Sequence, residues 1–165
     1  MTTYYTTINS PLDELMLVGN GEALTGLYMD AYKRRALDLN DWKQDKKLFA
    51  DAIKQLRAYF GKELKEFDLP LAFSGTDFQR KAWKALLTIP FGKTVSYQHQ
   101  ANKIKSPKAV RAVGMANGKN PISIIVPCHR VIGSNGKLTG YGGGLPRKRW
   151  LLEHEAAQGV LFEGP

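Results

Sequence analysis

The amino-terminal part of the chain alternates between apolar and polar positions in three short runs. The runs cover Tyr4 to Ile8, Glu14 to Val18 and Ala23 to Met29, and turn-forming stretches at 9–11 and 19–21 separate them. Alternation with a period of two between such turns is typical of β-strands that bury one face. The pattern therefore predicts a small antiparallel meander of strands.

A helical pattern follows the strands. Between Lys46 and Phe60 the apolar residues recur at helical spacing, and Gly61 comes directly after them. Glycine at this point is typical of a helix that ends on a residue in the left-handed conformation. We therefore expect one amphipathic helix that packs on the strands and is capped by Gly61.

The stretch from Glu66 to Gly75 separates this region from the rest of the chain. It contains Pro70 and has the character of an extended linker. It predicts a division into an amino-terminal α/β domain, residues 1–75, and a second domain, residues 76–165.

The second domain begins with helices whose starts are marked by capping residues. Thr76 and Gln79 form a capping-box pattern, and the helix that they open should run to about Thr88. A second helix is expected to open at Ser96 and to continue to Ile104.

A third helix is expected to follow after a tight turn. Ser106 and Pro107 fit the cap and the first helical position, and Asn117-Gly118 would end the helix. The short connection between the second and third helices is typical of a helix-turn-helix, with residues 107–116 as its second member.

The last part of the chain combines an apolar run, a glycine-rich loop and a final helix. The run from Ile122 to Val126 is short and β-branched, which favours a buried strand or extended segment. Six glycines lie within residues 133–144, and Pro146 opens a helix that should end near Gly159. The sequence thus predicts an α+β protein.

Composition and charge limit the kinds of partner, metal site and cellular location that we expect. The net charge of +9 and the pI near 9.7 favour a polyanionic partner. A single cysteine excludes an intrachain disulfide and a multi-cysteine zinc site, so we expect no metal. We find no export signal and no apolar stretch that could span a membrane, and an unpaired thiol fits a reducing cytoplasm.

The candidate chemistry centres on Cys128, the only thiol, which stands between Pro127 and His129. A free thiol is only a few per cent thiolate at neutral pH, so a nucleophilic cysteine needs a base or a positive field nearby. His129 and Arg130 could supply these, and His129 could act through a bridging water. The alternative is that Cys128 is a small buried hydrophobic residue.

A histidine that acts as a base needs an acceptor to hold its tautomer. Glu153 and Glu155 on the final helix are the available carboxylates. The alternative for both is a solvated helix face. Tyr97 is likewise either a core aromatic residue or a hydroxyl aimed into a pocket.

The third helix combines small and cationic residues. Ala109, Ala112 and Gly114 would let its backbone approach a partner closely, while Lys108 and Arg111 could meet phosphates. A tightly packed core helix would show the same small residues. The loop Gly140 to Gly144 lacks the Lys-Ser/Thr ending of a phosphate-binding loop, so its glycines fit better against a planar ligand.

Several of these motifs, in this order and spacing, resemble the O6-alkylguanine-DNA alkyltransferases. The resemblance is strong over residues 75–155 and loose in the amino-terminal part. Its motifs are Pro127-Cys128-His129-Arg130-Val131, Asn120-Pro121, Gly140-Tyr141-Gly142-Gly143-Gly144, Ile89-Pro90-Phe91-Gly92-Lys93, Ser96-Tyr97 and Arg111-Ala112-Val113-Gly114. It implies a ribonuclease H-like sheet with a helix, followed by a mainly helical winged helix-turn-helix domain.

The resemblance also implies a role for each matching residue. Cys128 would take the alkyl group from guanine O6, His129 would act as base through water, Glu155 would orient the imidazole, and Asn120 would brace the turn. The substrate-binding residues would be Tyr97, which donates to guanine N3, together with Val131, Tyr141 and Gly142. The DNA-binding residues would be Arg111, which fills the gap left by the flipped nucleotide, with Lys108, Ala109, Ala112 and Gly114.

The implied activity is single-turnover DNA repair without a cofactor, acting on alkylated double-stranded DNA. Because the product is a thioether, which offers no carbonyl for water to attack, each molecule would be consumed. We expect a monomer and leave cooperative assembly on DNA open. The alternatives are a hydrolase with a cysteine nucleophile and a DNA-binding module without catalysis.

Overall fold

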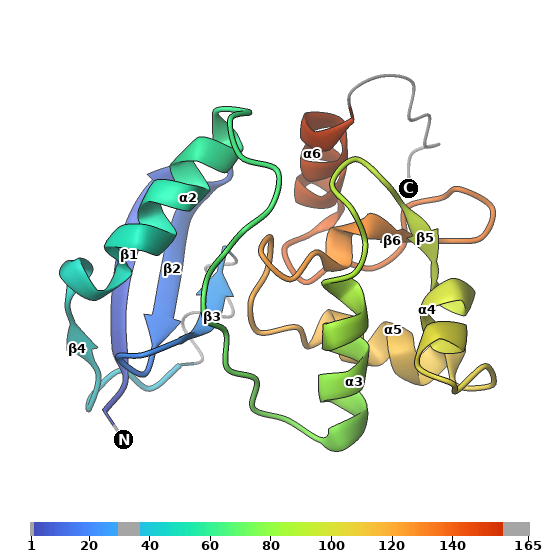
Figure 1. Ribbon diagram of the computed structural model, residues 1–165, viewed down its shortest axis with the longest axis horizontal. Helices are drawn as coiled ribbons and strands as arrows, with labels where there is room; N and C mark the ends of the chain where they lie inside the picture. The colour runs from blue at the N-terminus through green and yellow to red at the C-terminus, as the bar shows by residue number, and fades with distance from the viewer. Residues whose placement is uncertain (1, 30–36, 157–165) are drawn as a thin grey trace. The chain divides into compact units, whose positions relative to one another are not determined.

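The computed structural model describes residues 2–29 and 37–156, and it divides into two compact units (Figure 1). One unit consists of residues 1–73 and 121–123, and the other of residues 74–120 and 124–165. Nothing in the sequence pattern indicated that the short segment 121–123 belongs with the amino-terminal unit.

The amino-terminal unit is built on a four-stranded sheet with the strand order β3-β2-β1-β4. Its strands are β1 (Tyr4–Ser10), β2 (Asp13–Gly19), β3 (Leu24–Tyr28) and β4 (Lys43–Gln44). The first three pair antiparallel, which confirms the predicted meander. β4 pairs in parallel with β1 and was not predicted, because two exposed polar residues carry no alternation of their own.

Two returning segments cover the outer edge of β3. The N–H of Leu24 donates to the carbonyl of Pro70 over 2.9 Å, and the N–H of Leu27 donates to the carbonyl of Pro121 over 2.8 Å. These bonds satisfy backbone groups that an edge strand would otherwise leave open. They also explain why residues 121–123 belong to this unit.

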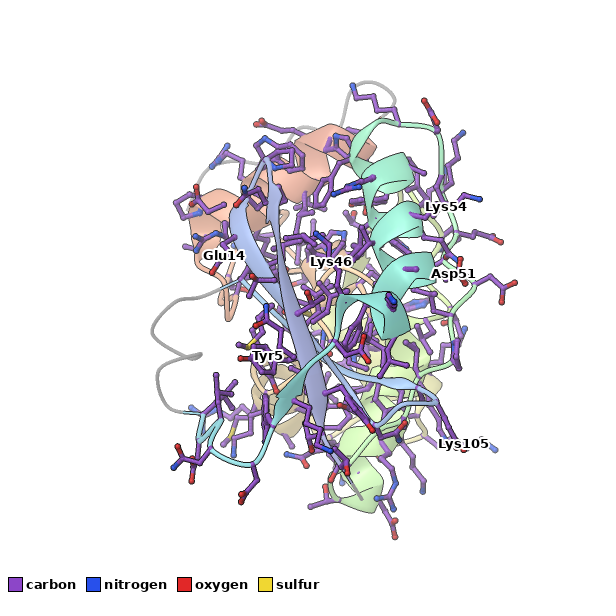
Figure 2. The ribbon with its side chains drawn as sticks, turned by 90° about the vertical axis from the view of Figure 1, so that its left-hand side faces the viewer. Tyr5, Glu14, Lys46, Asp51, Lys54 and Lys105 are labelled. Carbon is purple, nitrogen blue, oxygen red and sulfur yellow. The ribbon has the colours of Figure 1, made fainter. Side chains whose placement is uncertain are left out.

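One helix accompanies the sheet, as the sequence predicted. A 3₁₀ turn, η1 (Lys46–Phe49), leads into α2 (Ala50–Phe60). The buried side chains of α2 recur at helical spacing, and they are Ala52, Ile53, Leu56 and Tyr59. Asp51 and Lys54 lie on the side of α2 away from the strands in Figure 2.

The predicted cap of this helix is displaced by one residue. Gly61 has φ −81°, whereas Lys62 has φ +64° and takes the left-handed conformation. The N–H of Glu63 donates to the carbonyl of Ala58 over 2.8 Å, and the N–H of Lys62 donates to Tyr59 over 3.1 Å. This pair of bonds is a Schellman motif, in which the left-handed residue follows the C-cap.

The second unit consists mainly of helices. They are α3 (Asp77–Leu86), α4 (Tyr97–Lys103), α5 (Val110–Gly118) and α6 (Leu145–Glu155). Two short strands, β5 (Val95–Ser96) and β6 (Val131–Ile132), pair in parallel. Together with the amino-terminal sheet, this confirms the predicted α+β class. None of the helices in the described residues is long and apolar enough to span a bilayer.

The two predicted caps at the start of α3 and α4 are confirmed. Thr76 and Gln79 form a complete capping box, and the Ser96 hydroxyl accepts a hydrogen bond from the N–H of His99. The start of α5 was predicted three residues too early. The carbonyl of Ser106 accepts from the N–H of Ala109 in a separate turn, and α5 begins at Val110 without a side-chain cap.

Two other parts of the chain differ from the prediction, the apolar run 122–126 and the end of the last helix. The apolar run 122–126 is not a strand, because Ile124 has φ +73° and only Ile122 forms a β-bridge. Its apolar residues are buried in turns instead. The last helix ends at Glu155, since Ala156 is already extended; Gly159, where we predicted the end, lies outside the described residues.

Candidate active site and nucleic-acid interface

The thiol of Cys128 lies at the start of a single 3₁₀ turn, η2 (Cys128–Arg130), and is 6% exposed. If the extended segment predicted for residues 122–126 continued to Cys128, neighbouring side chains would point to opposite faces. In a 3₁₀ turn consecutive side chains are instead separated by about a third of a turn. His129 is therefore directed away from Cys128 into its own buried position.

Asn120 connects the turn before Cys128 to the thiol. Its Nδ2 donates to the carbonyl of Val126 over 2.8 Å and to the Cys128 Sγ over 3.2 Å. An amide N–H that donates to sulfur stabilises the thiolate more than the neutral thiol. Asn120 thus both braces the backbone and contacts the reactive atom.

His129 and Glu155 form a buried pair. The His129 Nε2 lies 2.7 Å from the Glu155 Oε2, and the two side chains are 0% and 1% exposed. Burial lowers the pKa of His129 below its ordinary value, although Glu155 acts in the opposite direction. No group in the described part of the chain hydrogen-bonds to the His129 Nδ1, which is buried. The imidazole is therefore neutral at neutral pH and has Nδ1 available for a proton.

Arg130 completes this buried network. Its Nε and Nη2 donate to the two carboxylate oxygens of Glu155 over 2.8 and 3.0 Å, and its Nη1 donates to the carbonyl of Ile89 over 2.6 Å. Burial acts to raise the pKa of Glu155, but His129 and Arg130 hold it well below its ordinary value. The sequence suggested that Arg130 could supply a positive field for the thiol. Its guanidinium instead binds Glu155 and keeps that carboxylate ionised.

Lys148 supplies a positive charge that we did not predict from the sequence. Its side chain on α6 is fully buried, and its Nζ donates to the carbonyls of Thr139 and Gly140 over 2.7 and 3.3 Å. Burial lowers the pKa of Lys148 to about 8, while the charge of Cys128 acts to raise it. Lys148 therefore holds the glycine-rich loop and places a cation near the thiol.

A sequence signal for Lys148 existed in the register of α6. The buried residues of this helix are Lys148, Leu151, Leu152 and Glu155. They follow the spacing of one helix face, so Lys148 occupies a position that the pattern assigns to the core. A lysine in such a position needs polar partners, and the loop carbonyls supply them.

Tyr97 is the first residue of α4, directly after β5, and Val131 is the first residue of β6, directly after the thiol turn. The Tyr97 hydroxyl donates to the carbonyl of Thr139 over 3.2 Å and accepts from the Thr139 hydroxyl over 3.1 Å. Burial raises the pKa of Tyr97, which keeps the phenol neutral and able to donate. Val131 is fully buried in β6, and its N–H donates to the carbonyl of Cys128.

The loop residues Tyr141 and Gly142 are half-buried and precede α6. The carbonyl of Tyr141 accepts a hydrogen bond from the N–H of Gly144 over 2.9 Å. Gly144 has φ +94°, a conformation that favours glycine, so this glycine is required by the turn itself.

The residues that we assigned to DNA binding fall into two groups. Arg111 and Ala112 lie on the exposed face of α5, and Lys108 is exposed in the turn before it. Ala109 is the half-buried N-cap residue. A Cβ atom on Gly114 would lie 3.9 Å from the Tyr97 ring, so Gly114 faces a neighbour within the unit. Only part of the predicted small-residue face is therefore open to a partner.

The positive charge is concentrated in the second part of the chain. Residues 74–165 contain 14 of the 24 lysines and arginines but only four of the 15 acidic residues, whereas residues 1–73 are close to neutral. The whole net charge of +9 thus comes from the part that carries Cys128 and α5. Such an asymmetry is typical of a surface that meets a polyanion.

Comparison with known proteins identifies the family of both parts. Residues 3–73 match the ribonuclease-like domain of 6-O-methylguanine DNA methyltransferase, and residues 77–157 match the DNA-binding domain of the same family. A methylated-DNA–protein-cysteine methyltransferase of Mycobacterium tuberculosis is 55% identical over 157 residues, which cover 94% of this chain and 93% of that protein. The relative from Methanosarcina barkeri is 51% identical over 152 residues, covering 92% and 96%.

Solved structures agree with this match. A crystal structure of the Mycobacterium tuberculosis protein in complex with DNA superposes with a TM-score of 0.87 at 55% identity and covers 93% of each chain. A methyltransferase from Pyrococcus kodakaraensis, at 19% identity and a TM-score of 0.56, shares the fold. The chain belongs to the family of 6-O-methylguanine DNA methyltransferases.

Proposed function

We propose that this protein repairs DNA by transferring an alkyl group from the O6 atom of guanine to Cys128, once per molecule. The observation that carries the proposal is the grouping of a lone thiol with a neutral buried histidine and an ionised carboxylate. Its membership of the family supports the same reaction. The protein is therefore a methylated-DNA–[protein]-cysteine methyltransferase.

The buried pair supplies the base. Because the Nε2–H of His129 donates a hydrogen bond to Glu155, the Nδ1 lone pair is directed away from the carboxylate and can take a proton. We infer that a water molecule carries the Cys128 proton to this nitrogen. Asn120 and Lys148 then stabilise the thiolate through an amide hydrogen bond and a nearby positive charge.

The thiolate attacks the alkyl carbon while the bond from that carbon to guanine O6 breaks. The bond electrons pass to guanine, and the Tyr97 hydroxyl donates its proton to guanine N3. The proton that His129 took from Cys128 then replaces the proton that Tyr97 has given up. In balance, the thiol proton moves to guanine and the alkyl group moves to sulfur. The product is a thioether, which water does not cleave, so Cys128 is not regenerated.

The remaining substrate contacts come from the backbone around the thiol. The carbonyls of Cys128 and Val131 would accept from the exocyclic amine of guanine, and the N–H of Gly142 would face O6. Tyr141 belongs to the same loop, which Lys148 fastens through two carbonyls. A planar base fits against this glycine-rich backbone because few side chains stand in the way.

Duplex DNA would approach the exposed face of α5. Arg111 would enter the space left by the flipped nucleotide, which costs a few kcal/mol to unstack. Lys108 would meet a phosphate, and Ala112, with Ala109 and Gly114 beside it, would keep the backbone close to the groove. We propose residues 76–165 as the part that binds DNA and accepts the alkyl group, and residues 1–75 as the amino-terminal domain.

We further propose that the protein acts as a monomer on alkylated double-stranded DNA. A single thiol that must stay reduced favours the cytoplasm as its place of work. Analytical ultracentrifugation with and without duplex tests the monomer and detects any cooperative assembly along the DNA.

Mass spectrometry of the intact protein tests the reaction. After incubation with a duplex that contains O6-methylguanine, the protein should gain one methyl group on Cys128, and the lesion should disappear in equal amount. The Cys128→Ser variant should bind the duplex but leave the lesion in place. Product that continues to form beyond the protein concentration would identify a hydrolase instead, and an unmodified protein with an intact lesion would overturn the proposal.

A further inference from the structure

An exposed methionine lies on α5, the helix that we propose to approach DNA. Met115 is 66% exposed, more than the other large exposed hydrophobic residues of the described chain, Leu48 and Leu87. Single apolar side chains on a surface are common and need no explanation by themselves. Its neighbours on α5 are what distinguish Met115.

Met115 shares one helix face with Arg111. It follows Arg111 by four positions and Ala112 by three, and residues separated in this way lie side by side on a helix. Gly118 and Lys119 continue the same exposed face. The face therefore carries a methionine between two cations, with only small residues beside it.

Contacts on the opposite face fix this orientation. The Trp83 Nε1 donates to the carbonyl of Ala116 over 2.8 Å. Asn117 and Gln100, both buried, exchange hydrogen bonds of 2.7 and 2.9 Å through their side-chain amides. Because these bonds hold α5, Met115 cannot turn into the core without breaking them.

The positive charge around Met115 indicates which kind of partner this face of α5 would bind. The helix α5 has no acidic residue, and the part of the chain that includes it carries the entire net positive charge. A groove of DNA presents phosphates at its edges with sugars and base edges between them, which matches an apolar side chain between cations. Methionine is suited to such an irregular surface because it is unbranched and polarizable.

We propose that Met115 is a further DNA-contacting residue, packed against sugars and base edges one helical turn from the point where Arg111 enters the duplex. This inference rests on the proposed function. Four helical residues rise about 6 Å, which is less than two base-pair steps, so Met115 would support the stack beside the gap. It would keep the gap open while the alkylated nucleotide is outside the helix.

The test compares Met115→Ala with Met115→Leu, which keeps most of the apolar volume. Fluorescence anisotropy gives the affinity for a duplex containing O6-methylguanine, and mass spectrometry gives the rate of Cys128 methylation from that duplex and from the free base O6-methylguanine. We expect Met115→Ala to weaken duplex binding and slow transfer by about three- to tenfold, as partial loss of a buried apolar contact implies. Met115→Leu should stay within about twofold, and reaction with the free base should be unchanged.

Three results would each have a definite meaning. Equal duplex affinity and rate in Met115→Ala and the unchanged protein would overturn the role of Met115. Equal losses with duplex and with free base would also overturn it, because they would indicate a structural defect. If the unchanged protein gains no methyl group from either substrate, the proposed function itself fails, and the inference fails with it.

Discussion

At the residue scale, the two buried cations near the thiol have different tasks. Arg130 donates to both oxygens of Glu155 and to the carbonyl of Ile89, so its charge is neutralised within the protein. Lys148 donates to the neutral carbonyls of Thr139 and Gly140, and neither of these partners carries a negative charge that would balance the lysine. An uncompensated cation raises the thiolate fraction of a nearby cysteine. The site thus uses one cation to hold the carboxylate and another to favour the nucleophile.

The buried charge of Lys148 should make stability depend on pH in a defined direction. Its pKa is lowered from 10.5 to about 8, so between these values the unfolded chain binds more protons than the folded protein. Stability then rises with pH in this window, because the folded state no longer holds a buried cation. Relative to Lys148→Met, the unfolding free energy should increase by about 2–3 kcal/mol from pH 8 to pH 10.5.

Denaturant titrations of both proteins across this range measure the difference. Both proteins should carry Cys128→Ser, because the Cys128 thiol interacts with Lys148 and would titrate differently in the two proteins. The contributions of groups distant from Lys148 then cancel when the two curves are subtracted. A difference that is constant from pH 8 to pH 10.5 would show that the pKa of Lys148 is not lowered.

At the scale of secondary-structure elements, the sequence predicted the features that depend on residues close together in the chain. It missed those that depend on contacts between residues far apart in the chain. The capping box at Thr76 and the strands β1 to β3 follow from local chemistry and periodicity. The 3₁₀ turn at Cys128 does not, because it is fixed by the hydrogen bonds of Asn120 and by the network of Arg130. The choice of Glu155 over Glu153 came from the resemblance, although the register of α6 also separates the buried residue from the exposed one.

The apolar run 122–126 shows the same limit. Its composition indicates burial correctly, but a buried strand and a buried turn have the same composition. Only Ile122 finds a strand partner, on Leu27, which is far away in the sequence. Pairing between distant segments leaves no periodic signal in either of them.

The helix α5 offers a prediction at this scale. Gly114 lies inside the helix, and an added Cβ would be at an ordinary contact distance of 3.9 Å from the Tyr97 ring. Since glycine in a helix interior costs about 0.5–1 kcal/mol relative to alanine, Gly114→Ala should stabilise the protein by that amount. The melting temperature should rise by about 2 °C.

The matched control is Ala112→Gly on the exposed face of the same helix, which should lower the melting temperature by a similar amount. Differential scanning calorimetry measures both variants. A drop in the melting temperature for Gly114→Ala would mean that Tyr97 leaves no room for the methyl group.

At the scale of the whole molecule, the uneven distribution of positive charge indicates different functions for the two parts of the chain. The near-neutral residues 1–73 contribute a sheet and one helix, and the basic residues 74–165 contain the thiol, its network and α5. Phosphate contacts dominate the affinity of most DNA-binding proteins and release counterions from the duplex. We therefore expect the salt dependence of binding to come from lysines and arginines of residues 74–165.

Two exposed lysines test this expectation. Lys119 lies at the end of α5, and Lys54 lies on α2 in the amino-terminal unit. If Lys119 meets a phosphate, Lys119→Gln should reduce the slope of log affinity against log salt concentration by about 1, because one counterion fewer is released. Lys54→Gln removes the same charge from the other part of the chain and should leave the slope unchanged. Fluorescence anisotropy titrations of one duplex at several salt concentrations give both slopes. Equal slopes for the two variants would contradict the expectation that the salt dependence comes from residues 74–165.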